Sequence, residues 1–163
     1  MIDVETRALA ERVLVACRAR QWTVATAESC TGGLVAGALT EIAGSSDVVD
    51  RGFVTYSNAA KMELLGVPET TLAAHGAVSR QTAEAMARGA LARAGVDLTV
   101  SITGVAGPGG GSAEKPVGLV HFAAAAKDGR LIQREKRYGD VGRSEVRRLS
   151  VLEALTMLLE LAT

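Results

Sequence analysis

A short stretch near the start of the chain carries two residues that could act as nucleophiles. Ser29 and Cys30 follow residues 22–27, which we expect to form a strand, and precede a small and apolar run that we expect to be a helix. At such a turn a hydroxyl or thiol can attack a carbonyl carbon, while the unpaired amides of the helix start hold the oxyanion. Serine is also among the best helix N-caps, so capping alone would explain Ser29.

A serine nucleophile needs a group that takes its proton. His75 is expected in a loop before Gly76 and His121 inside a strand, and neither belongs to a triad signature. Lys61 is the alternative base, because it lies near the start of an expected short helix, whose positive dipole end would lower the pKa of the amine. Tyr56, at the end of an expected strand, is placed to relay or orient the proton. The other interpretation of Lys61 is a solvated surface lysine.

Cys30 competes with Ser29 for the nucleophile role, because thiolates at helix N-termini are activated. The residue after a helix cap usually turns away from the cleft, however. We therefore expect Cys30 to be a small buried residue, while the thiol remains the alternative nucleophile.

A glycine-rich loop and one arginine are candidate ligand contacts. Residues 104–112 leave an expected strand, and their glycines permit close backbone approach to a phosphate or a sugar, or else form a flexible hairpin tip. The loop lacks the Gly-Lys-Ser/Thr ending of a P-loop, and Ser112 breaks the G-x-G-x-x-G register. Arg143, just before the last expected helix, either holds a phosphate or is a surface arginine.

The elements that must position these residues alternate along the chain. We expect helices at residues 3–20, 30–42, 59–65, 80–94 and from about 142, and strands at 22–27, 52–56, 98–103, 117–126 and 131–138. Alternating helices and strands predict right-handed crossovers and parallel pairing, and Asp128-Gly129 predicts a hairpin between the last two strands. The predicted fold is a three-layer α/β/α sandwich with a mixed, mostly parallel sheet and a late antiparallel hairpin.

Length, composition and charge indicate a single domain and argue against several kinds of partner. The 163 residues fit one domain, residues 1–163, and an aromatic content of 3% means that Ala, Val, Leu and Ile build the core. Eighteen basic and eighteen acidic residues balance, so we expect no nucleic-acid partner. Two cysteines without a disulfide framework favour a cytoplasmic protein, and we expect no metal site and no membrane segment.

Four separated blocks resemble a known family in both sequence and order. They are Ala27-Glu28-Ser29-Cys30-Thr31-Gly32-Gly33, Gly52 through Lys61, His75-Gly76-Ala77-Val78-Ser79, and Gly104-Val105-Ala106-Gly107-Pro108-Gly109-Gly110 continuing to Lys115-Pro116-Val117-Gly118. Together these blocks resemble the CinA C-terminal domain family over nearly the whole chain, and most closely its standalone members. Val105 and Gly109 depart slightly from the commonest form of the glycine loop. The N-terminal domain of the larger CinA proteins has no counterpart in these residues, so we expect its activities to be absent.

The resemblance implies an activity and a set of site residues. It implies hydrolysis of the carboxamide of nicotinamide mononucleotide in pyridine nucleotide salvage, without a cofactor, by a homodimer or other homo-oligomer. Ser29 would be the nucleophile, Lys61 the base, and Tyr56 the hydroxyl that assists proton transfer. The predicted substrate-binding residues are Cys30, Thr31, Gly32, Gly33, Asn58, Thr103, Gly104, Gly107, Gly109 and Arg143. A nucleotide-binding module without catalysis, or an amidase acting on another small amide, would also fit these residues.

Overall fold

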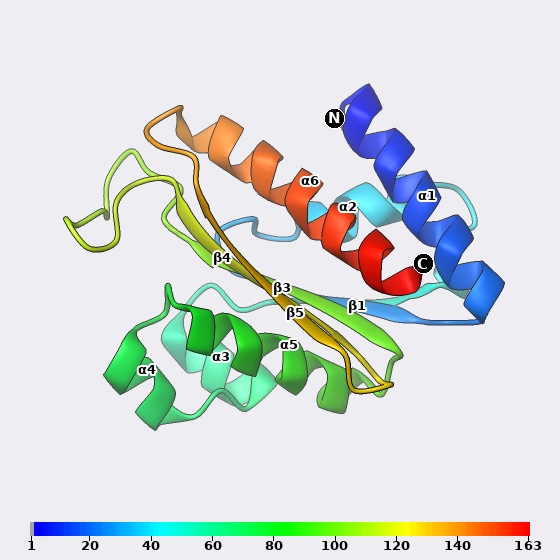
Figure 1. Ribbon diagram of the computed structural model, residues 1–163, viewed down its shortest axis with the longest axis horizontal. Coiled ribbons are helices and arrows are strands. Elements are labelled where there is room, and N and C mark those ends of the chain that lie inside the picture. The colour runs from blue at the N-terminus through cyan, green and yellow to red at the C-terminus, as the bar shows by residue number, and fades with distance from the viewer. Residues whose placement is uncertain (1) are drawn as a thin grey trace.

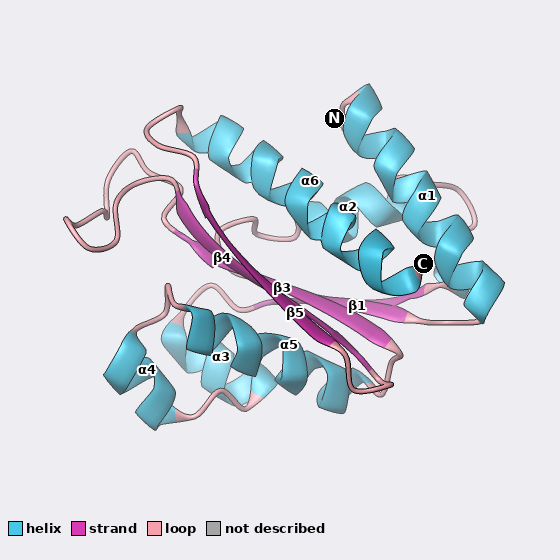
Figure 2. Cartoon of the chain, in the orientation of Figure 1, coloured by secondary structure: helices cyan, strands magenta, loops and turns pink. Residues whose placement is uncertain are grey.

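The computed structural model describes residues 2–163; Met1, the first residue of the predicted domain, lies outside the described residues. A five-stranded mixed sheet lies between two layers of helices (Figures 1 and 2), which confirms the predicted fold class. In chain order the elements are α1 (Val4–Arg20), β1 (Val24–Glu28), α2 (Leu34–Thr40), a 3-10 turn (Ser45–Asp47), β2 (Val49–Val54), α3 (Asn58–Leu65), α4 (Glu69–His75), α5 (Arg80–Ala94), β3 (Leu98–Gly104), β4 (Leu119–Ala126), β5 (Leu131–Arg137) and α6 (Arg143–Ala162).

The strand order brings the ends of three parallel strands together. The sheet has the order β2-β1-β3-β4-β5, in which β1 pairs in parallel with both β2 and β3. Strand β4 runs antiparallel to β3, and β5 antiparallel to β4, as the Asp128-Gly129 turn predicts. The register aligns Glu28 with Val54 on one side and with Ile102 on the other. The segments that follow β1, β2 and β3 therefore leave the sheet at the same edge.

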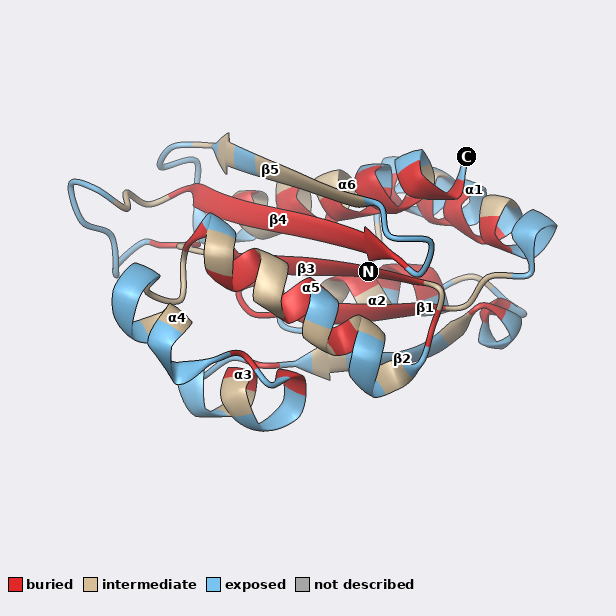
Figure 3. Ribbon diagram, turned by 60° about the horizontal axis from the view of Figure 1, so that its bottom comes forward, coloured by how far each residue is buried: buried red, intermediate tan, exposed pale blue. Residues whose placement is uncertain are grey.

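Helices α1, α2 and α6 cover one face of the sheet, and α3, α4 and α5 cover the other (Figure 1). The central strands are buried on both faces, as Figure 3 shows for β3 and β4. The core under α5 is built from small side chains, such as Ala83 and Ala123. Helix α3 packs closely on α5 because Gly89 has no side chain: a Cβ atom there would overlap the carbonyl oxygen of Leu65.

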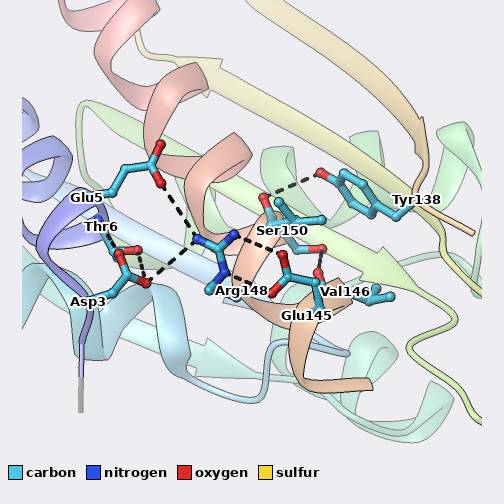
Figure 4. A network of polar contacts seen from close by, with 9 residues as sticks. Asp3, Glu5, Thr6, Tyr138, Glu145, Val146, Arg148 and Ser150 are labelled. Carbon is cyan, nitrogen blue, oxygen red and sulfur yellow. Dashed lines mark hydrogen bonds and ion pairs between the residues drawn. The ribbon is translucent and has the colours of Figure 1, made fainter. Parts of the chain in front are cut away.

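A polar network joins the first turns of α1 and α6 (Figure 4). The Arg148 guanidinium lies 2.9 Å from Glu145, 3.9 Å from Asp3 and 3.7 Å from Glu5. Asp3 also caps α1 by accepting a hydrogen bond from the amide of Thr6 at 2.8 Å. Exposed pairs of this kind add little stability each.

Three local predictions were wrong. The strand predicted at residues 52–56 spans Val49–Val54, so Tyr56 lies beyond its end. The helix predicted at residues 30–42 begins only at Leu34, because residues 29–33 form a turn in which Gly32 and Gly33 have positive φ angles of 58° and 102°. His75 is not in a loop but ends helix α4, which begins after Pro68. Proline has a φ angle suited to a helix start, and Leu72 anchors α4 to the small cluster under α3. Within residues 2–163 no helix has the length and apolar content needed to span a bilayer.

Candidate active site

The site begins where β1 and β2 end. Ser29 continues the ladder beyond β1, since its amide donates to the carbonyl of Ile102 at 2.9 Å. Thr55 does the same beyond β2, donating to the carbonyl of Glu28 at 2.8 Å. Side chains alternate between the two faces of a strand, so Glu28 and Ser29 point in opposite directions. Glu28 contacts α2 on one face, and Ser29 faces α3 on the other.

Lys61 bridges the two strand ends. Helix α3 is capped by Ser57, whose hydroxyl accepts from the amide of Ala60, and its first turn carries Lys61 back over the sheet edge. The Lys61 side chain is 1% exposed. Its Nζ lies 3.1 Å from the Oγ of Ser29 and 2.8 Å from the carbonyl oxygen of Thr55. A buried amine in this position can donate one N–H to the carbonyl and direct its lone pair at the serine hydroxyl.

Burial changes the proton affinity of the Lys61 amine. Removal from water disfavours the ammonium form and holds the pKa of Lys61 below the ordinary lysine value of 10.5, while the neighbouring Cys30 opposes this weakly. The direction agrees with the sequence prediction, but the main cause is desolvation and not the helix dipole. A neutral amine beside a serine hydroxyl is the arrangement that general-base catalysis requires.

A cavity of about 300 Å³ opens in front of Ser29 and Lys61. Such a volume is at the lower end for small-molecule sites. Its wall is formed by the two strand ends, the linker between α4 and α5, the glycine-rich loop after β3 and the start of α6. The remaining residues that line it are Cys30, Tyr56, Ala77, Val78, Thr103, Gly104, Val105, Ala106, Gly107, Gly109, Gly110 and Arg143.

Arg143 connects two parts of the cavity wall by hydrogen bonds. It is the first residue of α6, and its guanidinium donates to the carbonyl of Gly107 at 2.8 Å and to the hydroxyl of Tyr56 at 2.9 Å. Tyr56 is 60% exposed. Within residues 2–163 its hydroxyl makes no hydrogen bond to Ser29 or Lys61, so the proton relay predicted for Tyr56 has no direct contact in this geometry. The contact that the hydroxyl does make orients Arg143.

Cys30 is buried, as the sequence predicts, but it lines the cavity instead of turning away from it. Burial raises the pKa of its thiol to about 11. At neutral pH the sulfur is therefore protonated and a poor nucleophile. The backbone on either side of it is held from α6, since Arg147 donates to the carbonyl of Cys30 at 3.1 Å and to that of Thr31 at 3.4 Å.

The amides at the start of α2 are already occupied. The carboxylate of Glu28 lies beneath this helix start and accepts hydrogen bonds from its first turn. Gly33 N is one of those donors, and Gly32 N donates to the carbonyl of Ser29 at 3.0 Å. These two amides therefore cannot hold an oxyanion in this geometry, which corrects the prediction for Gly32 and Gly33.

The predicted substrate-binding residues divide into two groups. The cavity brings together Cys30, Thr103, Gly104, Gly107, Gly109 and Arg143. The residues Thr31, Gly32, Gly33 and Asn58 are not part of its lining. The first three lie in the turn that folds over Glu28, and Asn58 is an exposed residue at the start of α3.

Sequence reasoning missed two residues that contact the Ser29 turn. Glu28 carried a signal, because it is an acid at the end of a strand that is otherwise apolar or small and fully buried. Arg147 lies four residues after Arg143, which places both on one face of α6. That spacing would have indicated that α6 presents two arginines to the same region. Among residues 2–163 no group of three His, Cys, Asp or Glu side chains could hold a metal ion.

Comparisons with known proteins show which proteins this chain resembles. A family model described as the CinA C-terminal domain matches residues 6–162. A protein of Escherichia coli (strain K12) named nicotinamide-nucleotide amidohydrolase PncC is 54% identical over 159 residues, which cover 97% of this chain and 95% of that protein. A protein of Enterobacter agglomerans with the same name is 55% identical over 138 residues, covering 85% of this chain and 84% of the relative.

A solved structure has nearly the same fold. The competence/damage inducible protein CihA from Agrobacterium tumefaciens superposes with a TM-score of 0.98 at 56% identity, covering 100% of this chain and 99% of that one. The fold and the sequence therefore identify the same group of proteins.

Proposed function

Because the chain belongs to the CinA C-terminal domain family, we propose that it is an amidase that hydrolyses the carboxamide of nicotinamide mononucleotide to nicotinic acid mononucleotide and ammonia. Relatives of nearly the same length carry the name of that activity. The observation that carries the proposal is the 3.1 Å approach of the Lys61 amine to the Ser29 hydroxyl at the wall of a cavity. Under this proposal residues 1–163 act as a single amidohydrolase domain in pyridine nucleotide salvage.

The first half of the reaction uses the buried amine as base. Neutral Lys61 takes the proton of the Ser29 hydroxyl as the oxygen attacks the carboxamide carbon. The tetrahedral intermediate collapses when the Lys61 ammonium returns that proton to the nitrogen of the substrate. Ammonia leaves, and the nicotinoyl group remains attached to Ser29 as an ester.

The second half repeats the steps with water. Lys61, neutral again, takes a proton from a water molecule that attacks the ester carbon. The ammonium then protonates the departing oxygen of Ser29, and the acid product ionises in solution. The carbonyl of Thr55, 2.8 Å from Nζ, keeps the amine oriented in both halves.

The charges around the cavity suit a nucleotide. We assign the phosphate to Arg143, the guanidinium that lines the cavity, because a planar guanidinium can bind phosphate with two hydrogen bonds. We assign the oxyanion to amides of the glycine-rich loop, since the amides of Gly33, Val35 and Ala36 at the start of α2 are bound to Glu28. The candidates are the amides of Ala106, Gly107, Gly109 and Gly110, residues that line the cavity. Thr103 supports the opposite wall by donating to the carbonyl of Ala77 at 2.8 Å.

An ammonia assay on the purified chain tests the proposal. We expect release of ammonia and of nicotinic acid mononucleotide from nicotinamide mononucleotide, unchanged by a chelator. A panel with nicotinamide, nicotinamide riboside and unrelated small amides defines the substrate. Tight binding of the nucleotide with no product would contradict the assignment in favour of a binding module, and turnover restricted to another amide would contradict the substrate.

A further inference from the structure

A buried carboxylate lies directly behind the proposed nucleophile. Glu28, the last residue of β1, is 0% exposed and precedes Ser29 in the chain. It accepts five hydrogen bonds, from Thr31 Oγ1 at 2.6 Å, Gly33 N at 3.2 Å and Val35 N at 2.9 Å on one oxygen, and from Thr26 Oγ1 at 3.2 Å and Ala36 N at 3.0 Å on the other.

The hydrogen-bond partners of the Glu28 carboxyl group are mainly backbone donors. Three of the donors are backbone amides, which cannot accept a hydrogen bond, and they engage both oxygens. The two carboxyl oxygens of Glu28 accept from all of them. The buried negative charge is balanced by the positive end of α2, whose own N-cap, Gly33, has no side chain to cap it. Glu28 therefore caps α2 from the neighbouring strand.

The cap also fixes the backbone of Ser29. Ser29 is held on one side by its amide bond to Ile102 and on the other by its carbonyl, which accepts from Gly32 N at 3.0 Å. Residues 31–36 close over the Glu28 carboxylate, and Arg147 holds the carbonyls of Cys30 and Thr31 from α6. Hydrogen bonds to the Glu28 carboxylate and from the Arg147 guanidinium therefore both fix this turn.

We infer that Glu28 is a positioning residue for catalysis, whose carboxylate fixes the 29–33 turn so that the Ser29 hydroxyl stays within reach of Lys61. Glu28 and Ser29 lie on opposite faces of the strand end, so the carboxylate acts through the backbone and does not touch the substrate. This inference rests on the proposed amidase function. A displacement of about 1 Å between reacting groups can cost about 100-fold in rate, so even a small loosening of this turn is measurable.

The substitution Glu28→Gln tests the inference because it keeps the size of the side chain and places an amide NH2 against backbone N–H donors. We expect kcat for nicotinamide mononucleotide to fall about 10- to 100-fold with KM changed less than about threefold. Covalent labelling of Ser29 by a fluorophosphonate, which needs no nucleotide, is expected to slow by a similar factor. Both are measured well below the thermal transition of each variant.

A matched pair of variants separates positioning from stability. Thr26→Val removes one donor to Glu28, and Thr99→Val removes an equally buried hydroxyl that instead donates to the carbonyl of Ala87 at 2.9 Å, away from the site. We expect Thr26→Val to slow turnover and labelling about three- to tenfold and Thr99→Val to change neither, although both lose stability.

The outcomes are distinct. Wild-type rates of turnover and labelling in folded Glu28→Gln would overturn the inference, because they would leave the carboxylate with a structural role alone. If that variant does not fold, equal rates in Thr26→Val and Thr99→Val would overturn it. The labelling rates decide the matter even if the wild-type chain releases no ammonia from the nucleotide, a result that would count only against the proposed function.

Discussion

The amine of Lys61 lies 3.1 Å from the hydroxyl of Ser29, although 32 positions separate the two residues in the chain. Parallel pairing of β1 and β2 puts their carboxyl ends side by side, and α3 turns back over both. The contact therefore arises from the sheet order and not from any local motif.

The pH dependence of the reaction follows from the lowered pKa of Lys61. The neutral amine is the active form, so kcat/KM should rise with pH as Lys61 loses its proton. Because burial holds that pKa below 10.5, the rise should be centred below this value. Initial rates of ammonia release between about pH 5 and about pH 10 measure this rise in kcat/KM. A profile without an ascending limb would contradict the role of the amine.

The same pKa shift predicts how stability changes with pH. Lys61 binds its proton less tightly in the folded chain than in the unfolded one, so folding releases protons in the window below 10.5. The free energy of unfolding of the wild type should therefore increase relative to that of Lys61→Met as the pH rises from neutral toward 10.5. Urea unfolding at several pH values measures the difference. The exposed lysine control Lys127→Met should show a smaller change, and a constant difference for Lys61→Met would count against the shift.

The thiol of Cys30 should be dispensable for bond cleavage. With a pKa of about 11 it stays protonated at pH 7.5, so iodoacetamide should alkylate it slowly. Cys30→Ala removes a cavity contact and is expected to lower kcat less than about tenfold. Turnover numbers for this variant measure the effect. If Cys30→Ala abolished turnover while Ser29→Ala did not, the thiol would be the nucleophile.

The contact between Tyr56 and Arg143 predicts an effect on substrate binding. Tyr56→Phe removes one of two hydrogen bonds that orient the guanidinium, whereas the bond to Gly107 remains. KM for the nucleotide should rise about three- to tenfold with little change in kcat, and Arg143→Ala should raise KM about 100-fold. Steady-state kinetics decide between this and the proton relay. A large fall in kcat for Tyr56→Phe, at unchanged KM, would favour the relay.

Most of the fold could be predicted from the sequence because the periodicity of its elements is strong. The helix over Arg80–Ala94 and the hairpin at Asp128-Gly129 are examples in which apolar spacing and turn residues agree with the structure. Helix α4 was missed, because its Thr-Thr pair is a weak helix former and its stability comes from Leu72 packing on the cluster under α3. Propensity alone cannot supply that tertiary contact.

The site was harder to predict than the fold. Nothing local in the sequence placed Lys61 on Ser29, because the contact depends on strand order. The amide of Gly33, which was expected to help hold the oxyanion, is instead bound by the Glu28 carboxylate. This contact depends on the position of the Glu28 side chain under α2, which residue types alone do not predict.

The central claim is that a neutral Lys61 activates Ser29, and ammonia release by folded variants tests it most directly. The assay compares Ser29→Ala and Lys61→Met with wild type and with the exposed control Lys127→Met, at pH 8 and saturating nicotinamide mononucleotide, after circular dichroism has shown all four to be folded. We predict a loss of at least about 1,000-fold for Ser29→Ala and for Lys61→Met, and wild-type rates for Lys127→Met. Turnover within about tenfold of wild type in either site variant would contradict the account.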